Sequence, residues 1–87
     1  MTIELQLNNR LGLHLRVASL IVRTFSDFEC RGTVSFQGQR VDAASALNLV
    51  ILGAEPGSRL FFEIDGAKEH EAVIALSELF ARNFDED

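Results

Sequence analysis

From residue 32 to residue 42 the chain reads Gly-Thr-Val-Ser-Phe-Gln-Gly-Gln-Arg-Val-Asp, a pattern typical of a β-hairpin. Val34 and Phe36 alternate with polar residues, and Gln37-Gly38-Gln39 suits a tight connection into a second strand at Arg40-Val41-Asp42. Two strands that follow one another without an intervening helix pair as antiparallel neighbours. The hairpin therefore predicts a sheet that is mainly antiparallel.

The segments on both sides of this hairpin supply the remaining elements. Apolar residues alternate with polar ones at residues 3–8, which predicts a strand. Leu60, Phe62 and Ile64 alternate with Arg59, Phe61 and Glu63, which predicts another. Apolar residues at spacings of three and four predict a helix within residues 15–28 and a long last helix whose apolar face runs to Phe84. A short helix is expected at residues 45–52, with Ser45 as its N-cap and Gly53 just beyond its end.

The resulting element order is β-α-β-β-α-β-α. It predicts an α+β fold, a two-layer open-faced sandwich in which three helices cover one face of a four-stranded, mainly antiparallel sheet. A chain of 87 residues has one core, so residues 1–87 are expected to form a single domain. The pattern alone does not separate this topology from ferredoxin-like folds, whose element order is the same apart from the last helix.

Charge and composition exclude several classes of function. The net charge is −5, with +1 over residues 1–44 and −6 over residues 45–87, and this acidic excess disfavours nucleic acids and anionic membranes as partners. Cys30 is the single cysteine, which excludes an internal disulfide and a thiolate zinc site and indicates a reducing, cytoplasmic setting. The chain has no apolar run of about 18 residues, so no membrane insertion is expected. We expect neither a metal nor another cofactor.

The most informative segment is Gly12-Leu13-His14-Leu15-Arg16, which joins the first strand to the first helix. The first amides of a helix have no intrahelical partner, and the helix dipole favours an anion beside them. Arg16 adds a permanent cation whose planar fork suits phosphate oxygens, and Gly12 allows a tight turn. The segment therefore predicts a site for a phosphoryl group.

His14 is the candidate nucleophile of this site. A neutral imidazole is nucleophilic near neutral pH, and a phosphorylated ring nitrogen is a reactive phosphoryl donor. The helix amides and Arg16 could stabilise the transferred group without a metal. A surface histidine that is followed two residues later by an arginine is also common, so the spacing alone leaves both interpretations open.

The segment Asn9-Arg10-Leu11-Gly12-Leu13-His14-Leu15-Arg16-Val17-Ala18 resembles the active-site segment of the HPr family, the histidine-containing phosphocarriers of the bacterial phosphotransferase system. The resemblance extends over the whole chain. It implies that His14 accepts a phosphoryl group from phosphoenolpyruvate through enzyme I and passes it to a IIA component, with Arg16 assisting. Gly12, Leu15 and Val17 then form the phosphate-stabilising loop and helix start. Val17 stands where the family has proline, which loosens this helix start and restores one amide.

The resemblance also gives the short helix a function. The helix is apolar nearly all round, which predicts either an exposed patch for protein contact or burial by neighbouring loops. By resemblance, we expect partner contacts at Leu47, Asn48, Val50 and Ile51. Ser45 aligns with a serine that a dedicated HPr kinase phosphorylates in some members, and regulatory phosphorylation there is the expectation beside its N-cap role.

The interpretation is thus a monomeric, stoichiometric phosphoryl carrier rather than a turnover enzyme. The alternative is a non-catalytic regulatory protein of the same fold that acts by contact alone. A ferredoxin-like nucleic-acid module is disfavoured, because the chain is acidic and has neither Trp nor Tyr. Leu11 and the ending Phe84-Asp85-Glu86-Asp87 lean toward the nitrogen-related NPr branch. We expect Asp85-Glu86-Asp87 to be a solvated acidic end that frays the last helical turn.

Overall fold

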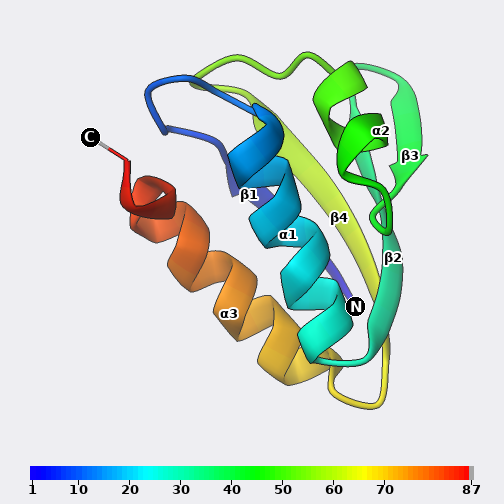
Figure 1. Cartoon of the computed structure of the whole chain (residues 1–87). Helices are drawn as coiled ribbons and strands as arrows, with labels where there is room; N and C mark the ends of the chain where they lie inside the picture. Colours follow the sequence, from blue (N-terminus) through cyan, green and yellow to red (C-terminus); the bar gives the residue numbers. More distant parts are fainter. Residues whose placement is uncertain (87) are drawn as a thin grey trace.

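The computed structural model describes residues 1–86 and confirms the expected order of elements. The strands are β1 (Thr2–Gln6), β2 (Cys30–Phe36), β3 (Gln39–Asp42) and β4 (Arg59–Gly66). The helices are α1 (Leu15–Asp27), α2 (Ala46–Ile51) and α3 (Glu69–Ala81), followed by a 3₁₀ turn at Asn83–Asp85. The helices lie on one face of the sheet (Figure 1). The fold is therefore the expected two-layer α+β sandwich.

The four strands are ordered β1-β4-β2-β3, and every neighbouring pair is antiparallel. β4 is central, with Leu60 opposite Leu5 of β1 and Phe62 opposite Val34 of β2. This order differs from a ferredoxin-like sheet, in which the first and third strands are neighbours. The β2–β3 hairpin turns at Gln37 and Gly38, both with positive φ, as in the type I′ turns that are common in two-residue hairpins.

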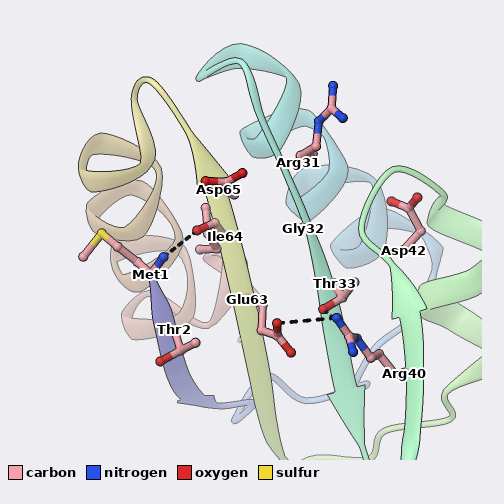
Figure 2. A pocket seen from close by; sticks show the side chains of 10 residues that line it. All are labelled: Met1, Thr2, Arg31, Gly32, Thr33, Arg40, Asp42, Glu63, Ile64 and Asp65. Atoms are coloured by element: carbon pink, nitrogen blue, oxygen red, sulfur yellow. Dashed lines mark hydrogen bonds and ion pairs between the residues drawn. The ribbon is translucent and has the colours of Figure 1, made fainter.

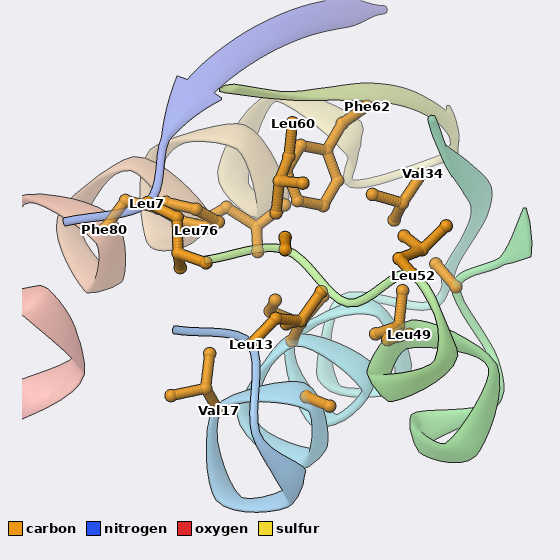
Figure 3. Packing of buried hydrophobic residues seen from close by; sticks show 14 of the residues in the cluster. Leu7, Leu13, Val17, Val34, Leu49, Leu52, Leu60, Phe62, Leu76 and Phe80 are labelled. Carbon is orange, nitrogen blue, oxygen red and sulfur yellow. The ribbon is translucent and has the colours of Figure 1, made fainter. Parts of the chain in front are cut away.

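The core lies between the sheet and the helices (Figure 3). Alternation along β4 turns Leu60, Phe62 and Ile64 inward, where all three are buried. The helical spacing does the same for α1 and α3. Their buried hydrophobic residues are Val17, Ala18, Ile21, Phe25, Ala72, Leu76 and Phe80. This core fixes the start of α1 and the end of α3 at the same end of the molecule (Figure 1).

The last helix ends earlier than its apolar pattern predicts. α3 stops at Ala81, and Asn83, Phe84 and Asp85 all adopt positive φ, so the chain reverses direction instead of continuing the helix. The Phe84 side chain is fully buried, with its ring edge-to-face against Phe80 at 4.8 Å between centroids. Phe84 therefore belongs to the core but not to the helix, and its burial anchors the chain end.

The other face of the sheet is open to solvent. A shallow pocket of about 420 Å³ lies on it, lined in part by Thr2, Thr33, Arg40 and Glu63 (Figure 2). Arg40 bridges this surface by donating to Glu63 Oε2 at 3.4 Å and to Thr33 Oγ1 at 3.3 Å. None of the candidate site residues lines this pocket. Within residues 1–86, no helix is both long and apolar enough to cross a membrane.

Candidate functional site

The loop before α1 turns on Gly12. Its φ is +74°, and a Cβ built there would lie 2.7 Å from the Ala54 carbonyl oxygen. Position 12 therefore requires glycine for two reasons: the backbone is left-handed, and the two loops approach each other closely. Leu13 donates its amide to the same Ala54 oxygen at 3.0 Å, and its side chain is buried. The backbone on both sides of Leu13 is thus fixed before the helix begins.

His14 is the N-cap residue of α1. Its backbone is extended, with φ −92° and ψ 178°, and its carbonyl accepts the amide of Ala18 at 2.9 Å. Its side chain makes no cap hydrogen bond to the residues that the structure describes. The first turn of α1 contains no acidic residue. The first-turn amides of α1 therefore keep their capacity for an anion, and the half-buried imidazole stands beside them.

Glu86 of the acidic chain end lies against this histidine, which corrects the expectation of a solvated tail at that residue, whereas Asp85 is exposed as expected. His14 Nε2 is 2.5 Å from Oε2 of Glu86, and Arg16 Nη2 is 3.3 Å from the same oxygen. The Glu86 side chain is only 14% exposed. Burial of Phe84 and the left-handed turn bring Glu86 back to the helix start, where the positive end of the helix dipole favours a carboxylate. Asp87 lies outside the described residues.

Asn9 completes the arrangement. Its Nδ2 donates at 2.7 Å to Oε1 of Glu86 and at 2.7 Å to the carbonyl of Gly12, so one buried amide joins the tail to the loop. If the Asn9 amide were flipped, its oxygen would face the Gly12 carbonyl and the Glu86 carboxylate, which are both acceptors. The nitrogen must therefore be on this side. The hydrogen bond from Asn9 is the main cause that lowers the pKa of Glu86, and His14 and Arg16 add to it.

Arg16 is held by the tail as well. Its Nη2 donates to the carbonyl of Phe84 at 2.5 Å, while half of the side chain stays exposed. The guanidinium is therefore placed beside the imidazole and keeps donors free for a further anion. His14 and Arg16, expected from the sequence, do come together.

The neighbouring positions have different environments. Leu15 is 57% exposed at the start of α1. Val17 is fully buried, so its side chain belongs to the core, and it can contribute to an anion site only through its backbone amide. The Gly12 amide already donates to the carbonyl of Asn9 at 3.3 Å, so the amides at the start of α1, but not the Val17 side chain, remain available to an anion.

Helix α2 presents an apolar surface and a cap. Leu47 and Ile51 are 70% and 71% exposed, Val50 is half-buried and Asn48 is exposed. Leu49 and Leu52 face the core, so part of the apolar run is buried and part of it is exposed. Ser45 Oγ accepts the amide of Asn48 at 3.3 Å, which confirms its N-cap role. α2 packs against α1, on the side of the molecule where α1 begins (Figure 1).

Sequence reasoning missed Asn9 and Glu86. Each residue is unremarkable in its own segment, and the two lie 77 residues apart in the chain. The available signal was Phe84, an apolar residue beyond the helix end that needed a buried place. Among residues 1–86, no group of three or more His, Cys, Asp or Glu side chains has the arrangement of a metal site.

Comparisons with known proteins show the family of the chain. Residues 1–82 match the family model described as "PTS HPr component phosphorylation site". "Phosphocarrier protein HPr" of Xylella fastidiosa is 43% identical over 84 residues, which cover 97% of this chain and 94% of the relative. "Phosphocarrier protein NPr" of Proteus mirabilis is 34% identical over 82 residues, covering 93% and 91%. Names from both branches therefore occur among its relatives.

Solved structures extend the comparison to three dimensions. The crystal structure of HPr-C-His from Thermoanaerobacter tengcongensis superposes with a TM-score of 0.91 at 31% identity, covering 100% of this chain and 98% of that chain. The crystal structure of an HPr from Bacillus anthracis superposes with a TM-score of 0.83 at 25% identity, covering 92% of this chain and 95% of that chain. Sequence and structure together place this chain in the HPr family, the phosphocarrier proteins of the phosphotransferase system.

Proposed function

We propose that His14 is the phosphoryl-accepting residue of this chain. The observation that carries the proposal is the position of its imidazole at the N-cap of α1, beside unpartnered first-turn amides and next to Arg16. A phosphoryl group on the ring would meet the helix dipole and a guanidinium, both of which favour negative charge. The acceptor would need no metal, because the protein supplies the positive charge itself.

The same family membership suggests the direction of transfer. The phosphoryl group would come from phosphoenolpyruvate through enzyme I and leave to a histidine of a IIA component. Phosphohistidine is a reactive donor, so the carrier can pass the group on without a further energy source. We place this exchange in the cytoplasm, with the carrier as a monomer whose apolar patch is free for each partner in turn.

The experiment is incubation with enzyme I and phosphoenolpyruvate, followed by intact-mass measurement before and after acid treatment. We expect one acid-labile phosphate on the wild type and none on His14→Ala. His70→Ala is the matched control, because His70 is an exposed histidine of α3 outside the site. Phosphate that remains on His14→Ala would refute the acceptor assignment. A folded wild type that accepts no phosphate from the enzymes I of both branches would favour the alternative, a regulatory protein that acts by contact.

We further propose that the docking patch for these partners consists of Leu47, Asn48, Val50 and Ile51. Leu47 and Ile51 are too exposed to serve the core, and an apolar cluster of this kind is typical of a protein contact. Leu47→Asp should raise the KM for transfer from enzyme I by about fivefold or more, since loss of a central contact costs more than about 1 kcal/mol. Ile74→Asp on α3, where Ile74 is 59% exposed, is the control. Equal effects of the two variants would remove the patch from the proposal.

Ser45 is the proposed regulatory position. A phosphate on its hydroxyl would add close to two negative charges beside the docking patch and weaken the partner contacts. The test is incubation with an HPr kinase and ATP, followed by peptide mass spectrometry that compares the wild type with Ser45→Ala. Absence of phosphate on Ser45 would exclude this regulation, and it would leave the role of His14 unaffected.

A further inference from the structure

Strand β2 has a stretch of free edge where β3 stops short. β3 pairs with β2 only over residues 33–36, so residues 30–32 have no strand beside them on that side among the residues that the structure describes. The chain turns away at this point, because Asp42 Oδ1 accepts the amide of Ala44 at 2.8 Å and α2 follows. The first part of β2 is therefore an edge of the sheet.

The backbone of this edge points outward at alternate residues. The Ala43 amide donates to the Gly32 carbonyl at 2.9 Å, which directs the even-numbered residues of β2 toward β3. The odd-numbered Arg31 is in register with Asp65 of β4 and directs its backbone groups there. The N–H and C=O of Cys30 and the N–H of Gly32 therefore point to the position that a longer β3 would occupy. Such groups are a template for another strand.

A pocket of about 320 Å³ opens beside the same edge, on the helix side of the sheet. Cys30 lies on the same face of β2 as Val34, which is fully buried. The pocket lies between this face and the second half of α1, and its lining includes Val22, Phe25, Cys30 and Ala44. It is therefore suited to an apolar side chain.

Arg31 belongs to the opposite, open face of the sheet. It is exposed, and its guanidinium forms no ion pair with the residues that the structure describes, whereas Arg40 on the same face pairs with Glu63 (Figure 2). A strand that bound at this edge would bring one of its side chains next to Arg31. An acidic side chain is favoured there, because the guanidinium is unpaired.

We propose that residues 30–32 of β2 bind an extended segment of another protein, which takes the place of a longer β3. The segment runs antiparallel to β2, as β3 does, and pairs its backbone with Cys30. Its residue opposite Cys30 enters the apolar pocket, and the residue before that one faces Arg31. The chemistry of the partner is therefore an acidic residue followed directly by an apolar one, in an extended conformation.

This contact is separate from the site at His14. The pocket adjoins the second half of α1, whereas His14 precedes the first residue of that helix (Figure 1). A segment bound at the β2 edge therefore leaves the histidine and the docking patch free. The inference does not depend on the role proposed for His14.

The test uses the full chain and a capped hexapeptide, Thr-Asp-Leu-Thr-Thr-Lys, followed by ¹H–¹⁵N NMR. We expect the amide signals of Cys30 and Gly32 to shift, with a Kd of about 1 mM or lower, as is typical of a short peptide that becomes ordered on binding. We also expect these two amides to exchange more slowly with deuterated water. The same peptide methylated on its leucine nitrogen is the matched probe, because it keeps both side chains and loses a backbone donor. It should bind about tenfold more weakly.

A charge reversal tests the orientation of the segment. Arg31→Glu should weaken binding of the hexapeptide by about threefold, and it should favour the peptide with Lys in place of Asp by a similar factor. Arg59→Glu is the matched control, since Arg59 lies on the same face but pairs with Glu4 of β1. It should leave both affinities unchanged.

Several results would overturn the proposal. One is the absence of any shift at Cys30 and Gly32 at several millimolar peptide, and another is a set of shifts confined to α2 and the His14 loop. Equal binding of the methylated peptide would exclude strand pairing, and equal effects of the two arginine variants would exclude the orientation. Protection of the same two amides in concentrated protein without peptide would show that a second copy of the chain occupies the edge instead.

Discussion

Adding one methyl group at Gly12 should loosen the segment that positions His14. The φ of Gly12 is +74°, where a residue with a side chain costs about 1–2 kcal/mol more than glycine. The new Cβ would also lie 2.7 Å from the Ala54 carbonyl oxygen, a backbone atom that cannot rotate away. Forcing extra volume into such a contact costs about 1–3 kcal/mol. We therefore expect Gly12→Ala to lower the free energy of unfolding by about 3 kcal/mol.

Gly53→Ala separates the two causes. Its φ of +68° is similar, but its Cβ would meet nothing nearer than 3.9 Å, so only the conformational cost of about 1–2 kcal/mol applies. Urea unfolding of both variants gives the difference, and in a domain of this size 1 kcal/mol corresponds to about 4–8 °C in Tm. Equal losses in the two variants would show that the approach of the two loops is not limiting, and would refute the role given to Gly12.

Three further predictions concern the tail and α2. Phe84→Ala should lower the free energy of unfolding by about 3 kcal/mol and release Glu86 from His14. Phe61→Ala, at a residue that is 41% exposed, should lower it less. Calorimetry would measure the change in stability, and NMR of the His14 ring would detect the release of Glu86. Ser45→Ala should cost about 1 kcal/mol by loss of the N-cap, and Ser45→Asp should restore it, as thermal unfolding would show. Hydrogen bonds lower the pKa of Glu86 in the folded protein. The contact of Glu86 with His14 and Asn9 should therefore be fully formed above the ordinary glutamate pKa of about 4.3, and it should be lost as the pH falls through the lower pKa of the folded state. An NMR titration should show this release in the wild type, and Glu86→Gln should lack it.

The order of elements could be predicted because it depends on local patterns. Alternation along β4 and helical spacing along α1 follow from burial of one face, and the structure reproduces both. The N-cap role of Ser45 follows from local hydrogen bonding and is likewise present. The strand order was left open, because period-two alternation shows that a strand has a buried face but not which strand lies beside it.

The candidate site could be predicted only in part, for the same physical reason. His14 and Arg16 are neighbours in the sequence, and a helix start by itself indicates an anion site. The tail could not be predicted in this way. A net acidic end next to the unfavourable end of the α3 dipole suggests fraying, whereas burial of Phe84 outweighs that effect and turns Glu86 toward a helix start of opposite polarity.

The sheet order also has a consequence for how the protein folds. The β2–β3 hairpin closes over two residues, but the β1–β4 pair joins residues such as Glu4 and Arg59 that are 55 positions apart. Closing so long a loop costs entropy before any contact repays it, so hairpin formation should precede β1 docking. β1 leads into the loop that carries His14, and Glu86 arrives from the other end of the chain. We therefore expect His14 to reach its final surroundings in the last phase of folding, after most of the core has formed.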